Sequence, residues 1–332
     1  MENQITAAMH RAVLLAAQGA GRTRSNPVVG AVIIDSLGAI ISEGFHAGGD
    51  HAEVVAIKNA PSIPAGSTIV VTLEPCNHTG KTGPCTEAII AAGIKKVVFA
   101  VSDPNPVAAG GRERLESEGV EVIEGELRDE ARYVNRAWLS VVEKKRPLFM
   151  WKVAATLDGK TAAADGTSKW ITGPEARTYV SELRRKSDAI VVGTGTVLTD
   201  DPELIPHDDV KAANPLRVVV GERSIPSGSK VLDGQAETYH HQSRDLGALV
   251  PELLNRGVKE VLVEAGAELG TALFKAGLID EIILIQAPTL LGSGRSFIGD
   301  LGLNTLDDRI DLRVISHDQI GSDLLTHLKV GK

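Results

Sequence analysis

The most informative part of the chain is His51-Ala52-Glu53, which is followed by Pro75-Cys76 and then by Pro84-Cys85. One imidazole and two thiolates can hold a tetrahedral Zn²⁺ and leave its fourth position to water. Thiolates with imidazole favour zinc over magnesium or calcium, and zinc lowers the pKa of bound water from about 15.7 to about 7. The histidine and both cysteines are therefore expected to be the zinc ligands of a hydrolytic deaminase.

Glu53 is the candidate general acid/base of this site. It would take the proton of the water and deliver it to a ring nitrogen and to the departing ammonia. Residues two positions apart do not share a face of a regular helix, so His51 and Glu53 are expected in the first turn of a helix that continues through 54–59. Pro84 directly before Cys85 predicts a second helix start, because proline is favoured in the first turn.

Two other interpretations of the cysteines are weaker. They could be unrelated core thiols, but the histidine, the glutamate and both Pro-Cys pairs then have no common explanation. They could form a disulfide, but the apolar stretch Ala12 to Ala17 is too short for the core of a secretory signal. We therefore expect a cytoplasmic protein, and in a reducing compartment a close cysteine pair more often binds metal or catalyses.

Length and composition indicate a two-domain enzyme for a small substrate. The chain has 332 residues with 43% hydrophobic content, and no apolar run approaches the roughly 20 residues of a membrane helix. Its 35 basic and 43 acidic residues give a net charge of −8, which argues against broad association with nucleic acid. We expect no nucleic-acid partner and no membrane association.

The first half alternates predicted helices and strands and is expected to be a layered α/β domain. Helices are predicted at Glu2–Gln18 and over a long closing segment, 127–145. Strands are predicted at Val28–Asp35, Ala39–Phe45, Thr68–Leu73, Lys96–Val101 and Val120–Ile123. The charged, proline-terminated run at 144–147 predicts a boundary near residue 146, which gives domains 1–146 and 147–332.

The second half also alternates strands and helices. Strands are predicted at Leu148–Ala154, Ala189–Gly193, Arg217–Val220, Glu260–Glu264 and Asp280–Gln286, with helices at Pro174–Lys186, Ala248–Arg256 and Leu269–Ala276. Residues 193–198 match only the first two glycines of a dinucleotide fingerprint. The loop Gly292-Ser293-Gly294-Arg295 could cradle phosphate, but such a loop is more often a plain turn.

Two sets of motifs, one in each half, occur in a family-specific order. The first set is Asn26-Pro27-Val28-Val29-Gly30, His51-Ala52-Glu53, Leu73-Glu74-Pro75-Cys76-Asn77-His78-Thr79-Gly80-Lys81-Thr82-Gly83-Pro84-Cys85 and Asp103-Pro104-Asn105-Pro106. The second set is Thr156-Leu157-Asp158-Gly159-Lys160, Ser168-Lys169-Trp170-Ile171-Thr172, Gly195-Thr196-Val197-Leu198-Thr199-Asp200-Asp201-Pro202, Val263-Glu264-Ala265-Gly266 and Ala287-Pro288-Thr289-Leu290-Leu291-Gly292. Over nearly its whole length the chain resembles the bifunctional riboflavin-biosynthesis deaminase/reductase family. The eight residues between the cysteines are distinctive, because most cytidine and adenosine deaminases separate theirs by two.

The resemblance implies a cytidine-deaminase-like three-layer domain followed by a dihydrofolate-reductase-like α/β domain. The first would use Zn²⁺ to hydrolyse the 2-amino group of 2,5-diamino-6-ribosylamino-4(3H)-pyrimidinone 5′-phosphate. The second would use NADPH to reduce the ribosyl chain, giving 5-amino-6-ribitylamino-uracil 5′-phosphate. Membership of this family also suggests a homodimer.

The resemblance also implies site residues. The metal and acid/base residues are His51, Cys76, Cys85 and Glu53. Substrate would be bound by Asn26, His78 and Lys81 in the first half and by Ser168, Arg184, Leu204, His207 and Glu264 in the second. The cofactor would be bound by Ala154, Trp170, Thr196, Asp200, Gly266, Leu269 and Gly270. Lys152 and Asp200 are the candidate proton donors of the reductase, and Trp170 could instead be an ordinary core residue.

The chain departs from the family pattern at two places. After Leu204 the family usually has a threonine and then an arginine that grips the substrate phosphate, but here the chain reads Ile205-Pro206-His207. His207 or Arg184 could take over that charge, or the reductase could be impaired or altered in substrate. Gly221 stands where an aspartate commonly ends a strand. A zinc-stabilised binding protein without turnover is a third hypothesis, and the presence of Glu53 argues against it.

Overall fold

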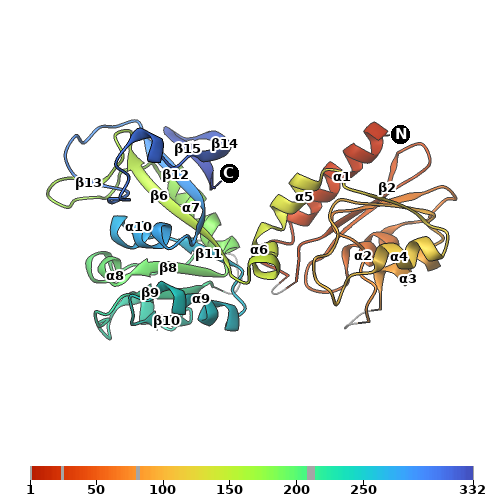
Figure 1. Cartoon of the computed structure of the whole chain (residues 1–332), viewed down its shortest axis with the longest axis horizontal. Coiled ribbons are helices and arrows are strands. Elements are labelled where there is room, and N and C mark those ends of the chain that lie inside the picture. The colour runs from red at the N-terminus through yellow and green to blue at the C-terminus, as the bar shows by residue number, and fades with distance from the viewer. Residues whose placement is uncertain (1, 24–25, 80–82, 208–213, 332) are drawn as a thin grey trace. The chain divides into compact units, whose positions relative to one another are not determined.

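The computed structural model describes residues 2–23, 26–79, 83–207 and 214–331. It divides into two compact units, Met1–Lys145 and Arg146–Lys332. Each unit is an α/β domain with its own sheet and its own hydrophobic core (Figure 1).

The first unit is built on a five-stranded sheet. Its helices are α1 (Glu2–Ala17), α2 (Ala52–Asn59), α3 (Cys85–Ala91), α4 (Gly111–Ser117), α5 (Arg128–Val134) and α6 (Arg136–Lys144), and its strands are β1 (Gly30–Ile34), β2 (Ile40–Phe45), β3 (Thr68–Val71), β4 (Lys96–Phe99) and β5 (Glu121–Glu124). The strand order is β2-β1-β3-β4-β5; β1 is antiparallel to β2 and β3, whereas β3, β4 and β5 run parallel.

Two glycines show which helix covers each face of this sheet. A Cβ on Gly30 would meet the carbonyl oxygen of Ala12 in α1 at 2.0 Å, and a Cβ on Gly44 would meet that of Ala52 in α2 at 2.4 Å. Gly44 pairs with Ala31, the neighbour of Gly30, so the two glycines face opposite sides of the sheet. The unit therefore has three layers, with α1 on one face and α2 on the other, and α3 packs beside α2 (Figure 1).

The predicted single helix over 127–145 is wrong, because the chain breaks at Asn135 into α5 and α6. The Asn135 side chain is 4% exposed, accepts the N–H of Val28 at 2.9 Å and donates to the carbonyl of Val28 at 2.8 Å. Asparagine side chains can replace main-chain partners in this way, at the expense of regular helix. The apolar periodicity of the segment contains no sign of this tertiary contact.

The second unit is built on an eight-stranded sheet. Its helices are α7 (Pro174–Lys186), α8 (Thr194–Asp200), α9 (Leu246–Asn255) and α10 (Ala267–Lys275), with 3₁₀ turns η1 (Lys230–Leu232) and η2 (Leu306–Asp308), and its strands are β6 (Leu148–Thr156), β7 (Lys160–Ala162), β8 (Ala189–Gly193), β9 (Leu216–Val220), β10 (Thr238–His241), β11 (Glu260–Val263), β12 (Ile279–Ala287), β13 (Arg295–Ser296), β14 (Leu312–Ile320) and β15 (Asp323–Val330). The order is β10-β9-β8-β11-β6-β12-β15-β14. In this order the first six strands run parallel to one another. β15 is antiparallel to β12, and β14 is antiparallel to β15. The carboxyl ends of the parallel strands form the edge at which α/β sheets bind ligands.

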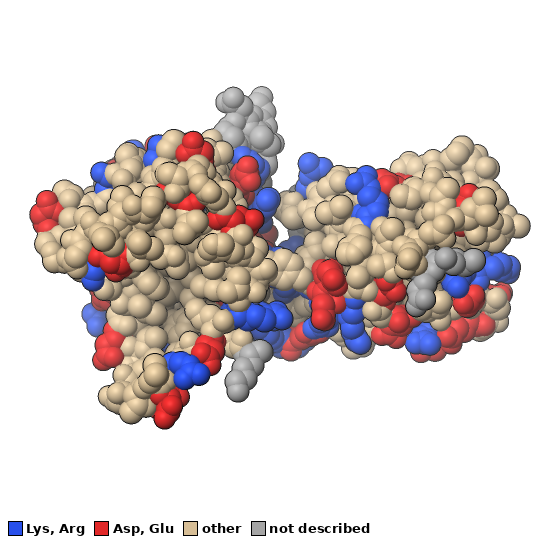
Figure 2. Space-filling view, turned by 90° about the horizontal axis from the view of Figure 1, so that it is seen from above, with Lys and Arg blue, Asp and Glu red and all other residues tan. Residues whose placement is uncertain are grey.

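The surface carries both signs of charge. On the face shown in Figure 2, acidic and basic side chains are interspersed on both units. Such a face offers no broad basic area to a polyanion. Within the part of the chain that the structure describes, no helix is long and apolar enough to span a lipid bilayer.

Candidate active sites

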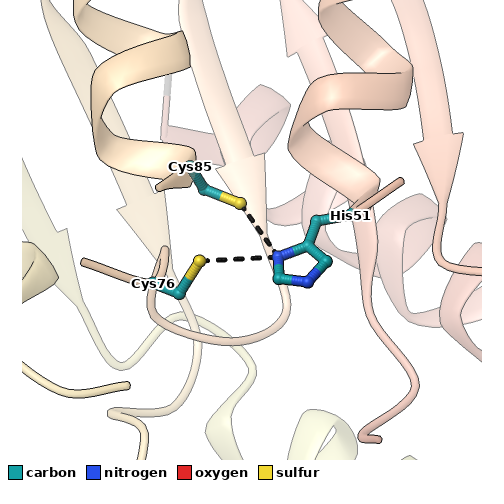
Figure 3. A group of neighbouring side chains, drawn as sticks. All are labelled: His51, Cys76 and Cys85. Atoms are coloured by element: carbon teal, nitrogen blue, oxygen red, sulfur yellow. Dashed lines mark hydrogen bonds between the residues drawn. The ribbon is translucent and has the colours of Figure 1, made fainter. Parts of the chain in front are cut away.

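The first site lies where α2 and α3 begin. His51 is the residue that precedes α2, Cys85 is the first residue of α3, and Cys76 lies in the loop after β3 (Figure 3). His51 Nδ1 lies 3.2 Å from Cys85 Sγ and 3.4 Å from Cys76 Sγ. Tetrahedral zinc bonds of ordinary length would place such atoms about 3.6 Å apart. The three ligand atoms, all within 4.8 Å of one another, therefore fit a zinc ion.

The three groups are electrostatically coupled. A hydrogen bond from Cys85 lowers the pKa of Cys76 to about 4, and the same contact together with burial raises the pKa of Cys85. The hydrogen bond to Cys76 raises the pKa of His51, although burial opposes it. Cys76 is thus the sulfur that most readily carries negative charge, and a bound metal ion would displace the proton that the two sulfurs share.

Glu53 lies in the first turn of α2, beside the same site, and is 3% exposed. Burial raises its pKa to about 7, although a hydrogen bond from its own main-chain N–H acts in the opposite direction. A carboxyl group with a pKa near the working pH can both accept and donate a proton during turnover. The position and the pKa of Glu53 therefore suit the acid/base part predicted from the sequence.

The loop that carries Cys76 is held by residues that the sequence analysis missed. The buried Glu74 carboxylate accepts the N–H of Asp103 at 3.2 Å and the N–H of Arg112 at 3.0 Å. A Cβ on Gly111 would lie 1.8 Å from the carbonyl oxygen of Pro75, so only glycine allows α4 to pack this closely on the loop. The order Glu-Pro-Cys was visible in the sequence, but the main-chain partners of Glu74 lie 29 and 38 residues further along the chain.

The loop is also tied to the segment of the other cysteine. Thr86 Oγ1 donates to Asn77 Oδ1 at 3.1 Å, and the Thr86 N–H donates to the carbonyl of Cys76 at 3.3 Å. Ala108 packs against both cysteines. The separation of the two sulfurs is thereby set by the fold.

His46 joins the predicted residue Asn26 to the metal site. Its Nδ1 lies 3.0 Å from the carbonyl oxygen of Asp50, which can only accept, so Nδ1 carries the proton and Nε2 accepts from the Asn26 amide at 3.4 Å. The ring of His46 is 4% exposed and packs edge-on against His51 at 5.4 Å. This histidine was not predicted, although its place just after β2 and five residues before His51 was visible.

The other two predicted substrate residues of this half are His78 and Lys81. His78 is half-buried, and its Nδ1 has no hydrogen-bond partner among the described residues. Lys81 lies outside the described residues.

In the second unit, the fold brings Lys152, Arg184 and Glu264 together. Arg184 donates to both oxygens of Glu264, at 2.6 and 3.0 Å, and the Lys152 ammonium lies 3.3 Å from the same carboxylate. All three side chains are largely buried. Burial alone would raise the pKa of Glu264, but the two cations outweigh it and hold that pKa at about 2.

Arg184 is therefore less available for a phosphate than the sequence suggested. Its third hydrogen bond goes to the carbonyl of Ile205 at 3.1 Å. This contact is made by main chain and does not depend on which side chain stands at 205. His207 is exposed, and its N–H donates to Ser181 at 2.7 Å. The Leu204 side chain is 2% exposed in the core, which leaves its main chain for a substrate.

Four of the seven predicted cofactor residues, Thr196, Gly266, Leu269 and Gly270, lie at the starts of α8 and α10. Thr196 lies in the first turn of α8, Gly266 precedes α10, and Leu269 lies within 4 Å of the Cβ position of Gly193. A Cβ on Gly266 would meet no described atom within 4 Å. Bare main chain at these strand ends lets a dinucleotide approach closely, so the residues present fit NADPH. Ala154 is half-buried near the end of β6, in the same unit.

Gly270 has a packing role as well. A Cβ there would lie 2.1 Å from the ring of Trp151, which is fully buried and donates to the carbonyl of Ala265 at 3.2 Å. The absence of a side chain at Gly270 is thus required for α10 to pack on β6.

Trp170 is not a core residue. It is 70% exposed, and the Arg177 guanidinium lies 4.7 Å from the centre of its ring, so the core alternative is wrong. Ser168 on the same segment is exposed too. Lys169 lies 3.9 Å from Asp200, which brings this segment to the end of α8.

Of the two candidate proton donors, Lys152 belongs to the buried cluster with Glu264, and Asp200 is exposed.

The glycine loop at 292–294 is occupied by the protein itself. Asp158 accepts the N–H of Leu291 at 3.2 Å and that of Gly292 at 2.7 Å. These amides are not free for a phosphate. Asp158 thereby links two motifs that lie more than a hundred residues apart in the sequence.

Comparisons with known proteins agree for both units. The family model "Cytidine and deoxycytidylate deaminase zinc-binding region" matches residues 2–101, and "RibD C-terminal domain" matches residues 147–326. The riboflavin biosynthesis protein RibD of Mycobacterium tuberculosis H37Rv is 41% identical over 330 residues, which cover 98% of this chain and 97% of that protein. The Escherichia coli K12 protein of the same name is 36% identical over 361 residues, with 96% and 98% covered.

Solved structures match over the whole length. Acinetobacter baumannii RibD has a TM-score of 0.90 at 36% identity, with all of both chains covered. The deaminase/reductase of Thermotoga maritima has a TM-score of 0.89 at 34% identity, with 99% of each chain covered. The chain belongs to the RibD family of riboflavin biosynthesis proteins, in which a cytidine-deaminase-like zinc-binding domain precedes the RibD C-terminal reductase domain.

Proposed function

We propose that this protein carries out two consecutive steps of riboflavin biosynthesis. The first is the hydrolytic deamination of 2,5-diamino-6-ribosylamino-4(3H)-pyrimidinone 5′-phosphate, and the second is the NADPH-dependent reduction of the ribosyl chain of the product. The Thermotoga maritima relative is described as a diaminohydroxyphosphoribosylaminopyrimidine deaminase and 5-amino-6-(5-phosphoribosylamino)uracil reductase. The observation that carries the proposal is the convergence of His51, Cys76 and Cys85 beside the buried Glu53.

In the first step, zinc would supply a hydroxide at neutral pH. His51, Cys76 and Cys85 would hold the ion, with Nδ1 as the ligand atom of the histidine. Glu53 accepts a proton from water and delivers it to the ring nitrogen as the hydroxide adds to the neighbouring amino-bearing carbon. It then takes the proton of the new hydroxyl group and delivers it to the amino group, so that the carbon–nitrogen bond breaks and ammonia leaves. Asn26, oriented by His46, and His78 lie on the substrate side, and Lys81 is proposed to meet the phosphate.

In the second step, NADPH supplies a hydride to the opened ribose. Lys152 is the proposed donor of the proton to the ribose oxygen, because the Glu264 carboxylate beside it fixes the ammonium in place. Asp200 remains the alternative donor. Ser168, Arg184, Leu204, His207 and Glu264 are proposed to line the substrate, with Ala154, Trp170, Thr196, Asp200, Gly266, Leu269 and Gly270 on the cofactor side.

An impaired reductase is not favoured. The departure at Ile205-Pro206-His207 changes side chains, whereas Arg184 is held by the main-chain carbonyl of this segment. The relatives also match throughout the second unit. Finer features stay proposals: the domain limits 1–146 and 147–332, a cytoplasmic location that keeps the thiols reduced, and a homodimer, which light scattering of the purified protein would test.

The test is a product analysis of the zinc-loaded protein by mass spectrometry. Without NADPH, the diamino substrate should be converted to the deaminated ribosyl product only, and added NADPH should convert that product to the ribityl compound. Glu53→Gln should slow deamination by roughly 10²-fold to 10⁴-fold yet reduce the deaminated product at the normal rate when it is supplied. Accumulation of the deaminated ribosyl product in the presence of NADPH would contradict the second step. A Glu53→Gln variant that deaminates at the normal rate would contradict the acid/base assignment.

A further inference from the structure

Arg223 is an exposed arginine just after β9 whose guanidinium lies beside the first turn of α8. Its Nη2 lies 3.0 Å from the position that a Cβ on Gly195 would occupy. Gly195 adjoins Thr196, one of the proposed cofactor residues. Because β8 and β9 are parallel neighbours, their carboxyl ends lie side by side. Arg223 therefore stands at the edge of the sheet where the cofactor is proposed to bind.

The charge of Arg223 is not used elsewhere in the described parts of the chain. Across residues 2–23, 26–79, 83–207 and 214–331, it has neither a hydrogen-bond partner nor an ion-pair partner. The carboxylate next to it in sequence, Glu222, is paired with Arg244 at 3.0 Å. The guanidinium of Arg223 is thus open to an anionic ligand.

Gly221, the first residue after β9, has no side chain that could repel such an anion, and the Glu222 carboxylate that follows it is paired with Arg244. Gly221 has φ +133°, and a Cβ there would lie 2.6 Å from Thr194 Oγ1, so an aspartate at this position would collide with α8. The His240 ring holds the same turn through the Gly221 carbonyl at 2.9 Å. In dinucleotide-binding α/β sheets, an acidic residue near this place binds the ribose 2′-hydroxyl of NAD, whereas an arginine accommodates the 2′-phosphate of NADP.

We propose that Arg223 binds the 2′-phosphate of NADPH and sets the preference of the reductase for NADPH over NADH. The inference rests on the proposed reductase function and adds a specificity-determining residue to it. A guanidinium can form two parallel hydrogen bonds with a phosphate, which a neutral ribose hydroxyl cannot match. Arg223 contacts no reacting atom, so its effect is on binding and not on hydride transfer.

The experiment compares two fragments of the cofactor by calorimetry on the full-length protein. The probes are 2′,5′-ADP, which carries the 2′-phosphate, and 5′-AMP, which does not. Arg223→Ala should weaken the binding of 2′,5′-ADP by roughly 10-fold to 100-fold and leave the binding of 5′-AMP within about twofold. The KM for NADPH should rise by the same factor while kcat is unchanged, and Arg223→Lys should recover part of the loss because it restores the charge without the fork.

Arg309→Gln is the control, because it removes an exposed arginine of the same unit that pairs with Asp311 at 3.1 Å. It should leave the binding of both fragments unchanged. Unchanged binding of 2′,5′-ADP by Arg223→Ala would overturn the proposal, as would an equal loss for both fragments or an equal loss in Arg309→Gln. A wild-type protein that binds neither fragment nor NADPH would overturn the reductase function itself, and the wild-type titration separates that outcome from failure of Arg223 alone.

Discussion

Replacing Glu264 by glutamine should destabilise the Arg146–Lys332 unit by about 3 kcal/mol at pH 7. In the folded protein the pKa of Glu264 is about 2, against an ordinary value of 4.5. At about 1.4 kcal/mol per pKa unit, this difference is worth about 3 kcal/mol. The side chain is only 9% exposed, so solvent screening reduces the figure little. Removing one partner of a buried ion pair costs about 3–5 kcal/mol by a separate estimate, because the remaining charges are left unpaired.

The same reasoning fixes the pH dependence. The folded-state pKa is depressed, so the stabilisation is fully present above about pH 4.5 and is lost as the pH falls towards about 2. The difference between wild type and Glu264→Gln should therefore be constant from pH 7 to pH 5 and should shrink to roughly half by pH 3.

Scanning calorimetry measures both effects, and the transition of this unit is the one that added zinc does not shift. For a unit of this size, about 3 kcal/mol corresponds to a Tm lower by about 6–12 °C. Glu252→Gln is the matched control, since Glu252 pairs with Arg256 at 2.7 Å on the surface and such pairs contribute about 0–1 kcal/mol. A loss below about 1 kcal/mol in Glu264→Gln, or a difference as large at pH 3 as at pH 7, would refute the reasoning.

Three further substitutions test other parts of the structure. Cys76→Ser should lower the zinc content and abolish deamination while reduction persists; metal analysis and product assays decide, and a full zinc complement would remove Cys76 from the ligands. Trp170→Ala should raise the KM for NADPH several-fold and change the free energy of unfolding by less than about 0.5 kcal/mol, because the ring is exposed and stacks on the Arg177 side chain; an unchanged KM would argue against cofactor contact. Gly270→Ala should destabilise the unit by about 1–3 kcal/mol, because its Cβ would collide with the fully buried Trp151, and calorimetry showing an unchanged Tm would contradict this packing role.

The elements that depend on local pattern could be predicted from the sequence. The continuous apolar run at 189–193 and the amphipathic segment 174–186 have the predicted bounds as β8 and α7. The first site was predictable for a similar reason, because zinc chemistry restricts the residue types and the helix starts fix where they lie. Local pattern is sufficient where one segment determines its own structure.

Elements that depend on tertiary contacts could not be predicted. The antiparallel strand β14 is largely exposed and lacks the apolar alternation that marks a half-buried strand. The short helix α8 begins directly after β8 and was not among the predicted helices. Glu74 is held by the main-chain N–H groups of Asp103 and Arg112, which only the fold brings to it, and no spacing rule connects it to those partners.

The break at Asn135 restricts the sequence at a position far from any chemistry. The side chain must offer one acceptor and one donor, in a fixed order, to the two main-chain groups of Val28. Ionised aspartate has no donor, leucine has neither group, and the longer side chain of glutamine would have to be accommodated at a position that is 4% exposed. The asparagine side chain supplies both groups, so one residue joins two segments that lie 107 residues apart in the sequence.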